Sequence, residues 1–166
     1  MGEDDGAALA AALGAQLDEL SFTGLGADQV TALVIETIVG WASAQGWRVY
    51  RRAPSVVSLP PPLDRQKSVL DVACARPGGA LPVAIEVDHT DRRRTVDKLV
   101  AEAAAGRVAL WVRWSTGRIA DPGPPVHLVP LAVTRPRPGA FARGAERPPP
   151  PHSSAGGSGT PMEFPL

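Results

Sequence analysis

Three acidic residues occur within two neighbouring apolar segments of the chain. Asp71 lies in SVLDVACA, at 68–75, and Glu86 and Asp88 lie in PVAIEVD, at 82–88. Both segments have the composition of buried strands, where Asp and Glu are disfavoured and an unpaired charge is costly. Along the second segment Glu86 and Asp88 share one face, roughly 7 Å apart. In a hairpin of the two segments, Asp71 meets them across the strand pair.

Three carboxylates in such proximity repel one another. Either their pKa values rise or a cation neutralises them. A ligand set made only of oxygen favours Mg²⁺ or Mn²⁺. Such an ion activates a water molecule and stabilises the charge on a phosphate under attack. The three acids therefore predict metal-assisted hydrolysis of a phosphate ester.

The segments around these acids predict a single α/β domain. We expect a helix from Asp28, its N-cap, to Gly46, one strand or two short ones at 47–59, strands at 67–75 and 82–88, a helix at 89–106, and strands at 107–114 and 126–134. The short Gly-rich connection before 82–88 predicts an antiparallel hairpin. The helix that follows is a crossover, so 107–114 should run parallel to 82–88. Pro130 places the last strand at an edge of the sheet.

The two ends of the chain differ from this domain in composition. Residues 1–27 are expected to form an Ala/Leu helix at 7–20, packed loosely or outside the core, and a connector. The α/β domain covers residues 28–134. Residues 135–166 include 13 Pro or Gly among 32 and predict a disordered tail. Such a tail can also dock a protein partner.

Charge and composition exclude several classes of protein. The formal net charge is zero, but residues 21–134 carry 13 basic and 10 acidic residues, a net of +3 that permits an anionic partner. The 15 Arg and two Lys, with abundant Ala, Gly and Pro, are typical of a GC-rich, actinobacterial genome. Cys74 is the only cysteine, which excludes an internal disulfide. No apolar run is long enough for a membrane span, and the acidic start is unlike a signal peptide, so we expect a cytoplasmic protein.

The order α-β-β-β-α-β, with Asp on the second strand and Ile-Glu-Val-Asp on the third, resembles the PD-(D/E)XK nuclease superfamily. The resemblance covers roughly residues 28–134. It implies a restriction-endonuclease-like core, with a mixed β-sheet flanked by helices, that cleaves DNA with Mg²⁺ or Mn²⁺. It also implies that Asp71 and Glu86 bind the metal ion, and that Glu36 on the first helix adds a third acid.

This chain departs from the family at the lysine of the motif, whose position is taken by Asp88. Some members of the family carry the lysine on the following helix instead, where Lys98 is the candidate. The resemblance then implies that Asp88 assists catalysis and that Lys98 polarises the phosphate. Arg92, Arg93 and Arg94 at the start of the same helix are the alternative to Lys98 as the source of positive charge for a phosphate of the nucleic acid.

Each of these residues also has an ordinary structural explanation. The strand acids can lie on a solvated sheet face, paired with Arg92 or Arg113. Lys98 can pair with Glu102 four residues on, and the arginine run can be a solvated helix start. The second hypothesis is therefore a nuclease-fold module without catalysis, which binds nucleic acid or assembles with a protein. A homodimer is compatible with both hypotheses.

Overall fold

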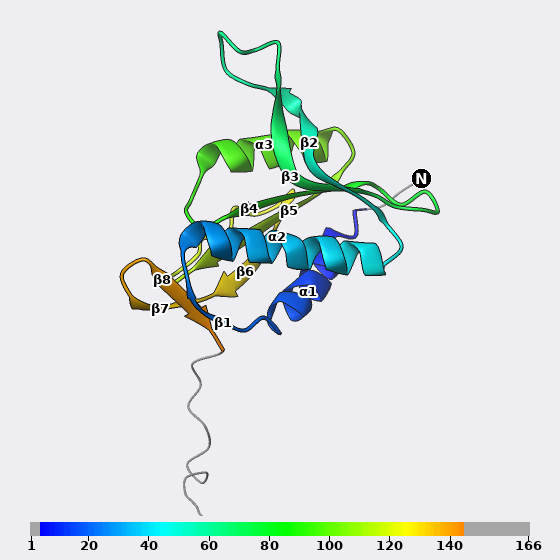
Figure 1. The fold of residues 1–166 in the computed structure, drawn as a ribbon. Helices are drawn as coiled ribbons and strands as arrows, with labels where there is room; N and C mark the ends of the chain where they lie inside the picture. Colours follow the sequence, from blue (N-terminus) through cyan, green and yellow to red (C-terminus); the bar gives the residue numbers. More distant parts are fainter. Residues whose placement is uncertain (1–3, 145–166) are drawn as a thin grey trace, which may run out of the picture.

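Helices and strands alternate along the chain in this computed structural model, which describes residues 4–144 (Figure 1). The helices are α1 (Gly6–Leu17), α2 (Ala27–Ala44) and α3 (Arg93–Ala104). The strands are β1 (Phe22–Leu25), β2 (Arg48–Ser58), β3 (Lys67–Ala75), β4 (Val83–Asp88), β5 (Val108–Ser115), β6 (Val126–Ala132), β7 (Thr134–Arg137) and β8 (Ala140–Arg143). Every element expected between 28 and 134 is present, and β2 is one strand rather than two.

A mixed five-stranded sheet forms the centre of the structure, in the order β2-β3-β4-β5-β6. The pairs β2–β3 and β3–β4 are antiparallel. The pairs β4–β5 and β5–β6 are parallel, with Val83 beside Val108 at the start of the first of them. The predicted hairpin, the predicted parallel crossover and the edge position of β6 are thus confirmed. Between β3 and β4, the turn passes through Gly78 and Gly79, both at positive φ, a conformation that glycine adopts without strain.

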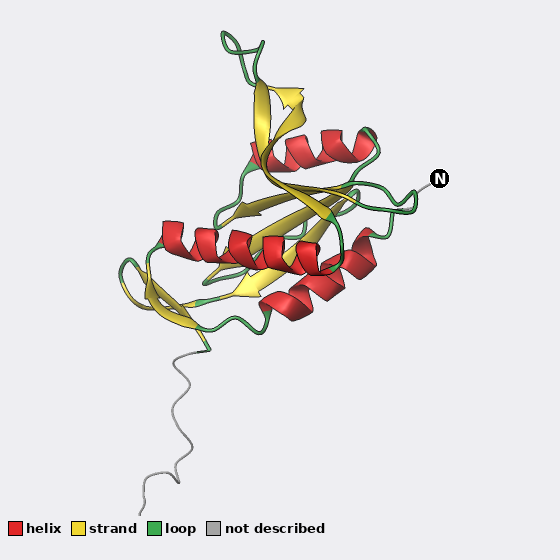
Figure 2. Cartoon of the chain, turned by 45° about the vertical axis from the view of Figure 1, so that its right-hand side comes forward, coloured by secondary structure: helices red, strands yellow, loops and turns green. Residues whose placement is uncertain are grey.

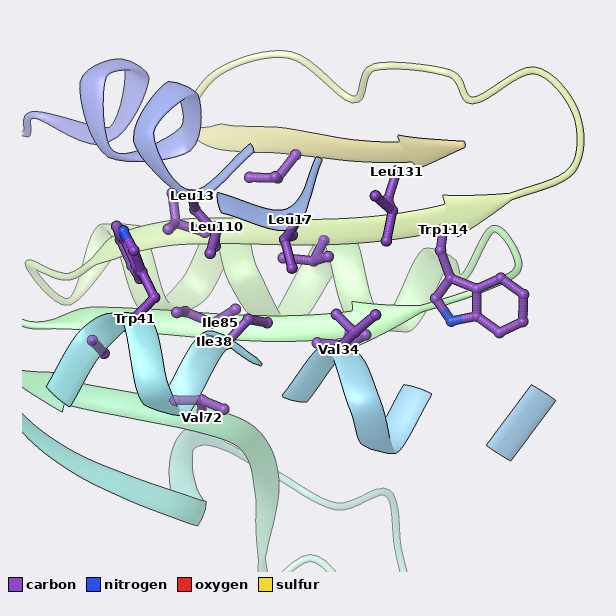
Figure 3. Packing of buried hydrophobic residues seen from close by; sticks show 14 of the residues in the cluster. Leu13, Leu17, Val34, Ile38, Trp41, Val72, Ile85, Leu110, Trp114 and Leu131 are labelled. Carbon is purple, nitrogen blue, oxygen red and sulfur yellow. The ribbon is translucent and has the colours of Figure 1, made fainter. Parts of the chain in front are cut away.

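Both faces of the sheet are covered by helices (Figure 2). On one face, Val34 and Ile38 of α2 pack with Val72, Ile85 and other central strand residues (Figure 3). On the other face, Leu99 of α3 packs with Ala109, Trp111 and Val126. Because side chains alternate along a strand, β5 supplies Leu110 to the first face and Trp111 to the second. Burial on both faces explains why β4 and β5 are nearly continuous apolar runs.

Helix α1 belongs to the core, which corrects the expectation that it packs loosely. Leu13 and Leu17 are four residues apart, so they share one face of the helix, and both are fully buried. They belong to the same cluster as Leu110 and Leu131 of the sheet (Figure 3). The alanines around them hide this contact in the sequence, because small residues give little periodic contrast.

The start of α2 differs by two positions from the expected start. Gly26 is the N-cap, and its backbone N–H donates to the side-chain oxygen of Gln29 at 2.8 Å. Asp28 therefore lies in the first turn of the helix instead of capping it. A carboxylate in the first turn is favourable because it faces the positive end of the helix dipole.

A second, three-stranded antiparallel sheet has the order β1-β8-β7. It corrects two expectations, because β1 lies in the expected connector and β7 and β8 lie in the expected disordered tail. Pro136 is tolerated in β7 because this strand is at an edge, and Gly139 supplies the positive φ of the turn to β8. Phe141 of β8 contacts Trp114 edge to face at a centroid distance of 5.0 Å. The rest of the predicted tail, 145–166, lies outside the described residues.

Between residues 4 and 144, no helix is both long and apolar enough to span a membrane.

Candidate active site

Asp71 lies where β3 and β4 diverge. The two strands pair only from Val72 to Cys74 on β3 and from Val83 to Ile85 on β4. One residue before this paired segment, the Oδ2 atom of Asp71 accepts a hydrogen bond of 2.8 Å from the backbone N–H of Val87. The Asp71 side chain thus accepts a hydrogen bond from β4 where the backbones of the two strands no longer pair. This bond holds Asp71 at the opening between the strands.

Glu86 lies on the same opening and is paired with a lysine from α3. Glu86 is only 6% exposed, and its Oε2 atom lies 3.3 Å from the Nζ atom of Lys98. Lys98 also donates a hydrogen bond of 2.8 Å to the backbone oxygen of Val69. Lys98 therefore joins α3 to both β3 and β4, and it does not form the expected alternative pair with Glu102.

Asp88 is fixed by a tryptophan from the neighbouring strand. Its Oδ2 atom accepts a hydrogen bond of 2.9 Å from the indole N–H of Trp111, and its Oδ1 atom lies 3.6 Å from Nε of Arg92. The alternative prediction, that a strand acid pairs with an arginine, is thus confirmed for Asp88, whose partner is Arg92. Arg113, the other partner considered, instead pairs with Asp91 at 2.8 Å.

The electrostatics of the acid pair show an excess of negative charge. Burial raises the pKa of Glu86 to about 7, helped by the charges of Asp71 and Asp88 and opposed by Lys98. Burial also raises the pKa of Asp71; the Val87 N–H, Lys98 and Arg52 oppose this rise and the charge of Asp88 adds to it. One neighbouring lysine does not fully offset the charges of the buried Glu86, the half-buried Asp71 and Asp88. An additional cation would restore both acids to their ionised forms.

The donor set fits one divalent cation. Asp71 and Glu86 each have one carboxylate oxygen engaged, while Asp71 Oδ1 and Glu86 Oε1 accept no hydrogen bond from residues 4–144. Two carboxylates completed by water and phosphate oxygens are a typical Mg²⁺ environment. In the same part of the chain, no three His, Cys, Asp or Glu side chains are grouped as a complete metal site. Any ion here therefore depends on water or substrate for its remaining ligands.

A pocket of about 710 Å³ opens above the acids. Four parts of the fold surround it: the starts of α2 and α3, the end of β4, and the outer part of the β2–β3 hairpin. The lining residues are Asp28, Thr31, Val57, Ser58, Ser68, Asp71, Glu86, Val87, Asp88, His89, Arg92, Arg93, Arg94, Thr95 and Lys98. The structure thus brings the two strand acids, Asp88, the lysine and all three predicted arginines to one pocket.

Glu36 does not belong to this site, so its prediction as a third metal ligand is corrected. Its carboxylate is exposed and forms a two-point ion pair with Arg51, at 2.5 and 2.9 Å. The part of α2 that reaches the pocket is its start, with Asp28 and Thr31. Glu36 follows Asp28 by eight residues, which is roughly 12 Å along a helix. The amphipathic pattern of α2 does not reveal which end faces the acids.

Two functional neighbours were missed by sequence reasoning. Arg52 lies between Arg51 and Ala53, which pair with Val72 and Leu70 on either side of Asp71, and it has a φ of 52°, a strained value for a residue other than glycine. Once both strands are assigned in full, the register of the hairpin predicts that Arg52 lies close to Asp71. Trp111, which fixes Asp88, has only the sequence pattern of an apolar core residue, and its position beside Glu86 follows from the parallel register.

His89 follows the acids and also lines the pocket. Its ring stacks on Trp114 at a centroid distance of 4.9 Å, and the indole N–H of Trp114 donates to Oγ1 of Thr31 at 3.0 Å. This stack connects the end of β4 to the start of α2. Since Trp114 is almost fully buried, the wall of the pocket next to β4 is well ordered by packing.

Comparisons of the chain with models of protein families, with curated proteins and with solved structures found no match.

Proposed function

We propose that this protein is a metal-dependent nuclease that hydrolyses phosphodiester bonds in DNA. The observation that carries the proposal is the meeting of Asp71, Glu86 and Lys98 at the point where β3 and β4 diverge. Two carboxylates with a free oxygen each, next to an amine, are the groups that metal-assisted hydrolysis requires. Arginines at the rim of the same pocket suit a phosphate backbone.

The proposal includes a restriction-endonuclease-like fold for the segment from α2 to β5. Its support is the element order α-β-β-β-α-β and a mixed sheet whose third and fourth strands are parallel. The acids occupy the second and third strands of this series, as the resemblance implies. Lys98 approaches Glu86 from the following helix, which suits a motif whose lysine has moved.

The residues would divide the chemistry among them. Asp71 and Glu86 would hold a Mg²⁺ or Mn²⁺ ion, which when bound supplies a more acidic water and positive charge for the phosphate. Lys98 would donate a hydrogen bond to the attacking water or to a phosphate oxygen. Asp88, held by Trp111, would position the end of β4 and accept a proton from a nearby water. Arg92, Arg93 and Arg94 would contact phosphates on either side of the scissile one.

A second function is favoured by one specific observation. Lys98 already contacts both Glu86 and the backbone of Val69, so the cluster also serves as a structural contact between α3 and the sheet. In that case the protein is a nuclease-fold module that binds nucleic acid or assembles with a partner. Of the Pro-rich segment suggested as a docking element, residues 145–166 lie outside the described residues.

Cleavage assays distinguish the two functions. We expect the wild type to cut supercoiled plasmid or single-stranded DNA in Mg²⁺ or Mn²⁺ but not in EDTA. Asp71→Ala should lose this activity, because it removes a metal ligand, whereas Glu36→Ala should keep it, because Glu36 lies outside the pocket. The measurement is the rate of product formation on gels, with folding checked by circular dichroism. Cleavage that is absent from the wild type, or that survives Asp71→Ala, supports the second function.

A further inference from the structure

The β2–β3 hairpin extends beyond the rest of the sheet. Only Val72–Cys74 of β3 pair with β4, so the preceding part of β3 has β2 as its single strand neighbour. We call residues 53–70 the arm; Figures 1 and 2 show it projecting away from the sheet. Val57, Ser58 and Ser68 of the arm line the pocket. The arm is therefore one wall of the pocket, and the start of α3 lies across from it.

A buried carboxylate fixes the base of the arm to α3. Glu102 is 2% exposed and accepts hydrogen bonds from the hydroxyl of Ser55 at 2.6 Å and from the backbone N–H of Val56 at 2.8 Å. Charge-assisted hydrogen bonds of this length are strong. Since Glu102 is on the same helix as Lys98 and the arginine run, the arm and these cations are held at a fixed separation.

Exposed cations lie on both walls: Arg94 of α3 lines the pocket, and Lys67 of the arm directly precedes the lining residue Ser68. Arg52, Arg65 and Lys67 belong to the hairpin that carries the arm, and Arg94 belongs to α3. None of the four forms an ion pair with another residue of the described chain, whereas Arg51, Arg92 and Arg93 each face an acid. Lys67 lies four residues before Asp71, about 13 Å along β3, and next to Ser68, which lines the pocket. That distance corresponds to the rise of about four nucleotides of a B-form strand.

We propose that the arm and the start of α3 form a two-walled cleft that binds the phosphate backbone of a nucleic acid. Lys67 and Arg65 contact phosphates several nucleotides from the one in the pocket, and Arg94 contacts the backbone from the opposite wall. The recognised chemistry is a continuous phosphodiester chain, and its length rather than its base sequence determines affinity. The position of the scissile phosphate in this cleft rests on the proposed function. The binding of a phosphate backbone by the cleft does not depend on that function.

Binding measurements with arm variants test this cleft. The probes are a fluorescent 30-nucleotide DNA strand, its duplex and the corresponding RNA strand, with Ca²⁺ replacing Mg²⁺ to prevent cleavage. We expect Arg65→Gln/Lys67→Gln to bind at least one of them about tenfold or more weakly at 0.1 M salt. The slope of log affinity against log salt should fall by about 0.7–0.9 for each phosphate that the variant no longer neutralises. The three probes show whether the cleft prefers a duplex, a single strand or RNA.

Arg48→Gln is the control, because Arg48 is exposed at the far end of β2, where it pairs with Ala75. It is ten residues, roughly 30 Å, from the position opposite Lys67. The proposal predicts that Arg48→Gln binds like the wild type. Equal losses of affinity in Arg48→Gln and Arg65→Gln/Lys67→Gln, or no binding by the wild type, would overturn it.

A small diester separates this inference from the proposed nuclease activity. Bis(p-nitrophenyl) phosphate has one diester and lacks the neighbouring phosphates that Arg65 and Lys67 are proposed to contact, so Arg65→Gln/Lys67→Gln should hydrolyse it at the wild-type rate while cutting DNA more slowly. If the wild type hydrolyses neither substrate but binding still depends on the arm, the proposed activity fails and the cleft stands. If the arm variant loses diester hydrolysis and DNA binding equally, its defect is not confined to the arm and the cleft is rejected.

Discussion

Replacing Glu86 by Gln is expected to remove nearly all cleavage activity while stabilising the metal-free protein above pH 7. Loss of one metal ligand removes several kcal/mol of transition-state stabilisation, so the rate should fall by a factor of about 10³ or more. Stability should rise because Glu86 is 6% exposed and its charge is only partly offset by Lys98. A neutral amide of the same shape removes the cost of burying that charge.

The pH dependence of this effect has a definite sign. The pKa of Glu86 is raised from 4.5 to about 7 in the folded protein, mainly by burial. A raised pKa means that the favourable contribution is present below pH 4.5 and is lost as pH increases through about 7. A shift of this size has an upper limit of about 3 kcal/mol. The Glu86→Gln variant does not undergo this decline, so the difference in stability between variant and wild type should grow between pH 5 and pH 8.

Denaturant unfolding of the metal-free proteins from pH 5 to pH 8.5 measures this difference. Glu36→Gln is the control, because Glu36 is an exposed acid in an ion pair outside the pocket. Its difference from the wild type should stay nearly constant over the same range. A Glu86→Gln variant that keeps its cleavage activity, or whose relative stability declines as pH rises, would contradict the proposed role of Glu86.

Replacing Lys98 by Met is expected to lower kcat for cleavage by about 10²- to 10³-fold while metal binding persists. The Nζ atom of Lys98 is the amine nearest to Glu86, at 3.3 Å, and removing one donor to a developing negative charge typically has an effect of this size. Since the charge of Lys98 lowers the pKa of Glu86, its removal should also raise that pKa further. The acid limb of the pH–rate profile should therefore move to higher pH in Lys98→Met.

Single-turnover rates measured against pH, for the wild type, Lys98→Met and Lys98→Arg, test this role. Lys98→Arg keeps the charge and should recover part of the rate and most of the pH profile. If Lys98 only joins α3 to the sheet, Lys98→Met would lose stability but would keep kcat at temperatures where it is folded. That result would remove Lys98 from the catalytic proposal.

The sequence is sufficient to predict how Asp71 and Glu86 meet, because strand alternation and a short hairpin leave few arrangements. The partner of Lys98 is ambiguous in the sequence, because a helical residue can pair along its own helix or reach across to the sheet. Tertiary packing decides between the two: Glu102 is engaged by Ser55 of the arm, and Lys98 is left to Glu86.

The errors arise where a long-range interaction overrides a local pattern. Helical periodicity predicts that Glu36 lies on α2, the helix whose start lines the pocket. It does not show that Glu36 is too far along this helix to reach the acids. The Pro and Gly content of 135–143 suggests disorder, yet Phe141 packs against Trp114 and β8 has β1 as a strand neighbour. The partner segments are more than 25 residues away in sequence, so composition within a short window carries no signal for either interaction.

Calorimetric titration of Mn²⁺ into the wild type and into Asp71→Asn at pH 7.5 tests the central claim most directly. The claim is that the half-buried Asp71 and the buried Glu86 form a pair of carboxylates that a divalent cation completes. It predicts one Mn²⁺ bound per wild-type chain and binding at least about tenfold weaker in Asp71→Asn. Only a fraction of a proton should be released on binding, because Glu86, with a pKa of about 7, is mostly ionised at pH 7.5. The absence of binding to the wild type, or equal binding by Asp71→Asn, would contradict it.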